Sequence, residues 1–185
     1  LIDPWSGTIK YDGKTIDEID QYVFRSSVTM VEQESALFPD SFKNNITLWD
    51  KSIEDFEIIL AAKDAQIHDF ISESKYGYDS MLIEDGQNIS AGQRQRVELA
   101  RVLAEDPRLA ILDEATSALD AKTEHELVKA IENRGITVVV VAHRMSTIKN
   151  CDEIIMLDNG SIVDRGSHQY LMQNCEKYKK LIRDN

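Results

Sequence analysis

The chain has 185 residues, of which 42% are hydrophobic and 29% are charged, and its formal net charge is -12. This length and composition are typical of one globular domain with a buried core. The acidic balance argues against a protein that binds the nucleic-acid backbone, because such proteins normally carry a basic surface. Two cysteines without metal-type spacing indicate neither a zinc site nor a disulfide framework. No apolar run reaches the length that spans a bilayer.

The N-terminal part of the chain is predicted to begin with a turn at residues 4–7 and a short strand at residues 8–11. Residues 13–15, Gly-Lys-Thr, resemble the end of a phosphate-binding loop. That pattern requires a glycine five residues before its second glycine, and this chain has Thr8 there. We therefore interpret residues 13–15 as a turn that leads into a one-sided helix over residues 16–24.

Residues 28–31 predict a buried strand, and a loop that contains Gln33 follows it. Residues 50–74 are predicted to be mostly helical, with their apolar residues in the core rather than at a ligand. The spacing predicts two apolar helix faces, which comprise Phe56, Ile59, Leu60 and Lys63 in the first, and Ile67, Phe70 and Ile71 in the second.

The densest chemical pattern lies at residues 88–120. Small residues at 89–93, Ile-Ser-Ala-Gly-Gln, precede a helix over residues 94–105, and small side chains at a helix N-terminus let backbone N–H groups approach a phosphate. The apolar run 109–112 predicts a strand buried on both faces. Asp113 and Glu114 follow at its carboxyl end, where ligands gather in parallel α/β sheets. Two acids there are costly unless they face a metal or a reacting group, so we expect Asp113 to hold Mg²⁺ and Glu114 to polarise a water molecule.

The C-terminal part of the chain alternates clear helix and strand signals. A helix is predicted over residues 123–134 with Gly135 as its C-cap, and a buried strand over residues 137–142. Asn159-Gly160 lies between two apolar runs and predicts a β-hairpin. A helical region is predicted to open at residues 167–171.

Three of these segments, in register, resemble the ATPase domains of ATP-binding cassette (ABC) transporters: residues 89–93 the signature motif, 109–114 the Walker B segment and 117–120 the D-loop. The resemblance implies an α/β, P-loop NTPase fold of the ABC-ATPase type, with a mostly parallel sheet and a helical signature subdomain. It implies one partial domain over residues 1–185, with the helical subdomain at about 40–95. Residues 1–39 and 96–185 would form the remaining core and the C-terminal region.

The same resemblance implies roles for individual residues toward ATP and Mg²⁺. Glu114 would be the catalytic residue that activates water, Gln33 would reach Mg²⁺ and that water, and His143 would contact the γ-phosphate. The residues expected to contact the nucleotide or cross a dimer interface are Ser90, Ala91, Gly92, Gln93 and Asp120. Ile89 and Ala91 depart from the Leu and Gly of the family motif, and the methyl group of Ala91 is expected to be tolerated at some cost in rate.

The strings at residues 117–120 and 142–148 are similar to those of exporters, and residues 88–93, Glu98 and residues 150–155 are most similar to bacteriocin or leader-peptide exporters. The expected partners are a second ABC ATPase domain in a head-to-tail dimer and the transmembrane domains of a transporter, with no nucleic acid. The implied location is the cytoplasmic face of the cell membrane, in particular the bacterial inner membrane.

The phosphate-loop lysine, the adjacent Mg²⁺-binding Ser or Thr and the adenine-stacking aromatic residue have no counterpart in the sequence, and family members carry them upstream of the position of Leu1. We therefore expect a fragment that lacks the Walker A strand and helix and that, by itself, binds ATP poorly and is inactive. The alternatives are a soluble ABC ATPase of DNA repair or translation, and a non-catalytic dimerisation or regulatory module that lost its phosphate loop. Intact Glu114 and His143 argue against the second alternative.

Overall fold

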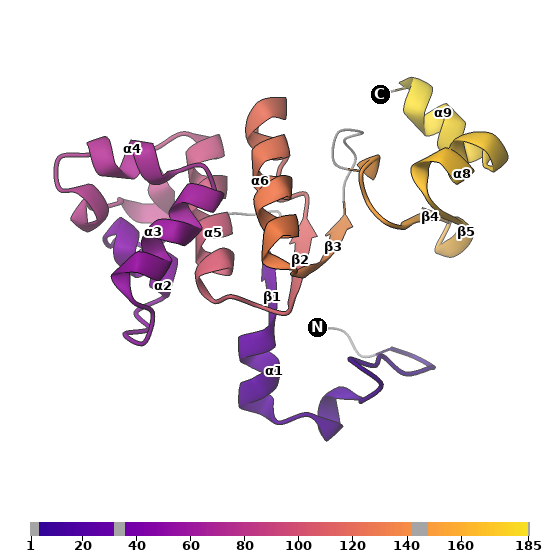
Figure 1. Ribbon diagram of the computed structural model, residues 1–185, viewed down its shortest axis with the longest axis horizontal. Coiled ribbons are helices and arrows are strands. Elements are labelled where there is room, and N and C mark those ends of the chain that lie inside the picture. Colours follow the sequence, from indigo (N-terminus) through magenta and orange to yellow (C-terminus); the bar gives the residue numbers. More distant parts are fainter. Residues whose placement is uncertain (1–3, 32–35, 142–147, 185) are drawn as a thin grey trace.

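The computed structural model describes residues 4–31, 36–141 and 148–184. Within them, a helical region lies in the chain between the first and second strands of a three-stranded parallel sheet, and a C-terminal unit follows the last strand of that sheet (Figure 1). The fold class is α/β, as the sequence predicts. No helix in these three ranges is both long enough and apolar enough to cross a membrane.

The sheet consists of β1 (Val28–Val31), β2 (Leu109–Asp113) and β3 (Thr137–Val141), in the order β1-β2-β3, with both pairs parallel. All three strands match predicted segments, and the central strand β2 alternates between buried and half-buried residues. The prediction that β3 is a buried strand is wrong, because none of its residues is fully buried, and Val139 and Val141 are about half exposed, at 49% and 50%. Only the other face of β3, formed by its intervening residues, packs against the hydrophobic core of the described chain.

The strand predicted at residues 8–11 is also wrong. Tyr11 instead makes an isolated bridge with Lys14, in which the two residues exchange backbone hydrogen bonds of 2.8 and 3.1 Å across a tight turn. Residues 8–10 are exposed and pair with no strand among the described residues, so alternation alone does not make them a strand. The predicted turn at residues 13–15 into a helical segment is confirmed.

The single helix predicted over residues 16–24 is split into the 3-10 helix η1 (Ile16–Glu18) and helix α1 (Gln21–Ser27). Asp20 separates them, because its carboxylate accepts hydrogen bonds from the backbone N–H groups of Tyr22 and Val23 and so begins a new helix.

The helical region occupies one side of the sheet in Figure 1. It contains α2 (Phe42–Thr47), α3 (Asp55–Asp64), α4 (His68–Glu73), two 3-10 turns η2 (Gly77–Asp79) and η3 (Glu84–Gly86), and α5 (Ala91–Ala104). Helix α5 packs against α2, α3 and β1, and thereby joins the helical region to the sheet.

The prediction of which residues of α3 are buried in the core is wrong, whereas the corresponding prediction for α4 is confirmed. Phe56 and Leu60 of α3 are 63% and 51% exposed, and the buried residues are Ile58 and the alanines at 61 and 62. Alanine allows two helices to approach closely, and this face of α3 lies against α5, so the larger apolar residues point away. In the α4 segment, Ile67 and Ile71 are fully buried.

Helix α6 (Ala121–Arg134) follows β2, and Gly135 ends it in the left-handed conformation with φ of 67°, as the sequence predicts. The C-terminal unit consists of β4 (Ile154–Asp158), β5 (Ser161–Gly166), α8 (His168–Asn174) and α9 (Glu176–Asp184). Its hairpin turn at residues 159–160 has positive φ at both positions, and a small separate hydrophobic cluster holds the unit together.

Candidate functional site

The two adjacent acids predicted to carry the chemistry lie at the carboxyl end of the central strand. Asp113 is the last residue of β2, is half-buried and is in register with Val141 of β3. Glu114 follows with φ of 50°, a left-handed conformation that costs a residue with a side chain about 1–2 kcal/mol. The backbone N–H of Glu114 donates to the carbonyl of Val141 at 3.0 Å, so β3 holds this turn from one side.

The predicted signature residues lie at the N-terminus of α5. Ser90 is the exposed N-cap, and its Oγ accepts from the backbone N–H of Gln93 at 3.2 Å. The Gln93 side chain accepts in return from the backbone N–H of Ser90 at 2.8 Å. This capping box uses a lone pair of the Ser90 hydroxyl, so its O–H can still donate to a phosphate oxygen.

Two small residues of this motif differ in what the fold requires of them. Ala91 is exposed and has an ordinary helical backbone, so no glycine is needed there on conformational grounds. Gly92 is different: a Cβ atom at this position would lie 2.9 Å from the carbonyl oxygen of Ala118. The glycine therefore lets the first turn of α5 lie directly against the loop between β2 and α6.

Asp120, at the end of this loop, is engaged in capping α6. Its carboxylate accepts from the backbone N–H groups of Lys122 and Thr123, at 3.1 and 3.0 Å, and from the Thr123 hydroxyl at 2.7 Å. The hydroxyl and backbone hydrogen bonds from Thr123 lower the pKa of Asp120. The structure thus gives Asp120 a local structural role that the sequence analysis did not include.

Two predicted site residues, Gln33 and His143, lie outside the described residues. Of the others, Gly92 in the first turn of α5 lies against Ala118, in the loop between Glu114 and Asp120. A single carboxylate such as Asp113 suits Mg²⁺, which is commonly held by one or two protein carboxylates together with water and substrate phosphates. The described part of the chain contains no cluster of three or more His, Cys, Asp or Glu that could hold a metal by itself.

Three polar residues of α5 were not predicted as site residues, although they connect the elements around the site. Gln95 and Glu98 are 7% and 6% exposed. Gln95 binds the loop after β2, while Glu98 and Arg101 bind the backbone of Ala36, just after the segment that contains Gln33. The signal that could have identified Gln95 and Glu98 is their position among the buried apolar residues of an amphipathic helix.

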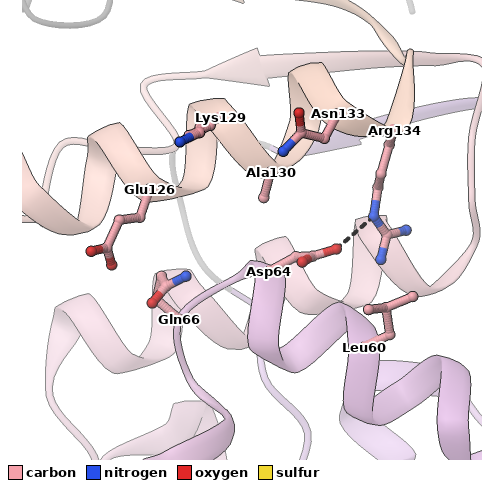
Figure 2. Close-up of a pocket in the computed structure, with 8 residues that line it drawn as sticks. All are labelled: Leu60, Asp64, Gln66, Glu126, Lys129, Ala130, Asn133 and Arg134. Atoms are coloured by element: carbon pink, nitrogen blue, oxygen red, sulfur yellow. Dashed lines mark hydrogen bonds and ion pairs between the residues drawn. The ribbon is translucent and has the colours of Figure 1, made fainter.

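A crevice of about 410 Å³ lies between α3 and α6 (Figure 2). An ion pair of 2.7 Å between Asp64 and Arg134 crosses it, and Leu60, Gln66 and Lys129 line it further. None of the predicted site residues that the structure describes lines this crevice.

The comparisons with known proteins agree with this architecture. The family model described as ABC transporter matches residues 1–117. The ATP-dependent lipid A-core flippase of Alcanivorax borkumensis is 43% identical over the whole chain, which covers 32% of that protein. The exotoxin translocation ATP-binding protein PaxB of Pasteurella aerogenes is 42% identical over 92% of the chain, which covers 24% of that protein.

Among solved structures, that of a bacterial Atm1-family ABC exporter with ATP bound superposes with a TM-score of 0.92 at 36% identity, over 98% of this chain and 32% of the exporter chain. The chain thus spans about a third or less of the length of these relatives. The matched family model, the relatives and the superposed fold agree with the three sequence motifs. The chain therefore belongs to the ABC transporter family and is an ATP-binding domain sequence of the exporter type.

Proposed function

We propose that this chain is the catalytic and signature part of the ATPase of an ABC exporter, in which ATP hydrolysis drives transport across a membrane. The observation that carries the proposal is the position of Asp113 and Glu114 at the carboxyl end of the central strand, followed by a loop whose Ala118 carbonyl lies against Gly92 in the first turn of α5. A carboxylate at the end of a parallel strand can act on water, and a helix N-terminus can bind phosphate, so the two together suit hydrolysis of the phosphoanhydride bond of ATP at sites shared between two copies of the domain.

In this proposal Glu114 accepts a proton from the attacking water, and His143 and Gln33 hold the γ-phosphate and the water in place. Mg²⁺, held by Asp113 and by Gln33, would neutralise charge on the phosphate oxygens. The N-terminus of α5, with Ser90, Ala91, Gly92 and Gln93, would bind the phosphate of an ATP molecule held by a second copy of the domain. Asp120 would lie at the interface of this head-to-tail dimer. The helical subdomain at about 40–95 would move as a unit with α5.

The transmembrane domains of the exporter would dock on the apolar surface beside α2. Phe38 and Trp49 are 40% and 49% exposed, with ring centroids 5.2 Å apart. Met81 is 59% exposed on the neighbouring segment, which the hydrogen bond from Leu82 N–H to the carbonyl of Asp40 holds against residues 40–42. Exposed apolar groups concentrated in this way are typical of a protein contact.

The location that follows from this proposal is the cytoplasmic face of a cell membrane, in bacteria the inner membrane. The relatives above are named for two classes of cargo, one for lipid A and the other for an exotoxin. Within the proposal we favour a peptide as cargo, because residues 88–93, Glu98 and residues 150–155 resemble bacteriocin or leader-peptide exporters. The net charge of -12 supports a partner other than nucleic acid.

The test is the ATPase rate of the exporter that carries this chain, with Glu114→Gln and with the exposed α6 control Glu132→Gln. Loss of a general base lowers the rate by about a hundredfold or more, whereas the control stays within about twofold of the wild type. ATP binding, measured by equilibrium dialysis, should persist in both variants. Full activity of Glu114→Gln would exclude the role proposed for this carboxylate. The 185-residue chain and a version extended upstream through a phosphate loop, compared side by side, should differ, with activity in the extended version alone.

A further inference from the structure

Gln95 connects α5 to the loop that carries Glu114. Its side-chain Nε2 donates to the backbone carbonyl of Glu114 at 3.2 Å and to the Ser117 hydroxyl oxygen at 3.1 Å. Its Oε1 accepts from the backbone N–H of Ala118 at 2.9 Å. Gln95 is 7% exposed, so these bonds are shielded from water and are costly to lose.

The bond to Glu114 acts on a strained part of the backbone. Glu114 has φ of 50°, and its N–H and C=O groups are both held, the first by Val141 and the second by Gln95 and by the N–H of Ser117. A strained conformation persists only where its surroundings determine it. Because the two flanking peptide groups fix the direction of the Cα–Cβ bond, Gln95 contributes to where the Glu114 carboxylate points.

A second contact fixes the same two elements relative to each other. Gly92 is one turn before Gln95 on α5, and its lack of a side chain lets the helix approach the carbonyl of Ala118. The loop after β2 is therefore held by α5 both at a close backbone contact and at a buried amide. A primary amide suits this position, since it donates two hydrogen bonds and accepts others while carrying no charge.

We propose that Gln95 is a positioning residue for catalysis, which holds the backbone turn of Glu114 and thereby sets the position of this general base from α5. The inference rests on the proposed function, because it takes Glu114 as the group that activates water. It adds that α5, which follows the N-cap Ser90, helps to set the geometry of the carboxylate of Glu114 after β2.

The test uses Gln95→Glu in the full exporter, with Gln173→Glu on the exposed surface of α8 as the control for the added charge. A carboxylate can still accept from Ala118 N–H and from a rotated Ser117 hydroxyl, but it cannot donate to the carbonyl of Glu114. Loss of this bond lowers kcat for ATP hydrolysis about ten- to a hundredfold, with KM for ATP within about twofold of the wild type. The ratio of variant to wild-type kcat should rise as the pH is lowered, because a protonated carboxyl group can donate again.

The outcomes separate this inference from the proposed function. Wild-type activity of Glu114→Gln would refute the proposed function itself. An inactive Glu114→Gln together with a wild-type kcat for Gln95→Glu would overturn the inference alone. Parallel loss of kcat and of ATP binding in Gln95→Glu would also overturn it, because that pattern indicates a general structural role. If Gln95→Glu does not fold, Gln95→Asn, which is neutral but too short to reach the loop, is measured with the same kcat and KM criteria.

Discussion

The hydrogen bond that Glu98 accepts from Ala36 can be tested by comparing two substitutions, Glu98→Ala and Glu98→Gln. The Glu98 carboxylate accepts from the backbone N–H of Ala36 at 2.7 Å through Oε1, and the side chain is 6% exposed. Its other oxygen, Oε2, is buried without a hydrogen-bond partner among the described residues. Arg101, one turn further along α5, donates to the carbonyl of the same Ala36 at 3.0 Å.

The two substitutions differ in which interactions of the Glu98 side chain they remove. Alanine leaves the Ala36 N–H without this acceptor, which costs about 1–3 kcal/mol, and removes a buried methylene worth about 0.8 kcal/mol. Burial lowers the pKa of Arg101 while the charge of Glu98 raises it, so both substitutions remove a favourable charge. Relief of the half-satisfied carboxylate offsets part of this, and we expect a net loss of about 2–4 kcal/mol. Glutamine keeps the acceptor and removes the buried charge, so its change should stay within about 1 kcal/mol.

The assay is urea unfolding of the 185-residue chain, combined with hydrogen exchange at the Ala36 amide. Glu98→Ala should lower the free energy of unfolding and accelerate Ala36 exchange, while Glu98→Gln and the exposed control Glu132→Ala should do neither to a comparable extent. Equal losses in the alanine and glutamine variants, or unchanged Ala36 exchange in Glu98→Ala, would show that this carboxylate does not hold Ala36.

Two further predictions concern helix α6 and its contacts. The pKa of Asp120 is lowered in the folded state, so its cap contributes stability above the unfolded pKa of about 4 and loses it as the pH falls through the lower folded value. Urea titrations across this pH range should show that Asp120→Asn, which still caps the helix but does not titrate, loses less free energy of unfolding than the wild type as the pH falls. Identical pH dependence in the two proteins would show that titration of Asp120 does not contribute to the loss. Arg134 has two acidic partners, Asp64 at 2.7 Å with 23% of its side chain exposed and Asp106 at 3.7 Å with 84% exposed. Asp64→Asn should therefore cost about 1–2 kcal/mol in thermal unfolding and Asp106→Asn less than about 0.5 kcal/mol, and equal effects would argue against the partly buried pair as the stronger contact.

Much of the secondary structure followed from the sequence because its signals are local. The apolar run of β2, the terminal glycine of α6 and the Asn-Gly hairpin turn each depend on residues within a few positions of one another. Patterns of this kind failed where a distant element had the deciding influence. Alternation at residues 8–11 gave no strand without a neighbour to pair with, and the apolar face of α3 was decided by its fit against α5.

The candidate site likewise contains residues that local sequence patterns indicate and contacts that only the tertiary structure shows. Asp113, Glu114 and Ser90 were chosen as candidates from sequence alone, because acids after a buried strand and small residues at a helix start are local signs of phosphate chemistry. Their roles, like those of Gln33 and His143, remain predictions. Only the tertiary structure assigned Gln95 to the Glu114 turn, 19 residues away, and Glu98 to Ala36, 62 residues away. It also showed that Gly92 is needed for contact with Ala118. Such pairings depend on how α5 packs against the sheet and its loops, and periodicity within one segment carries no information about which distant backbone group a buried side chain will meet.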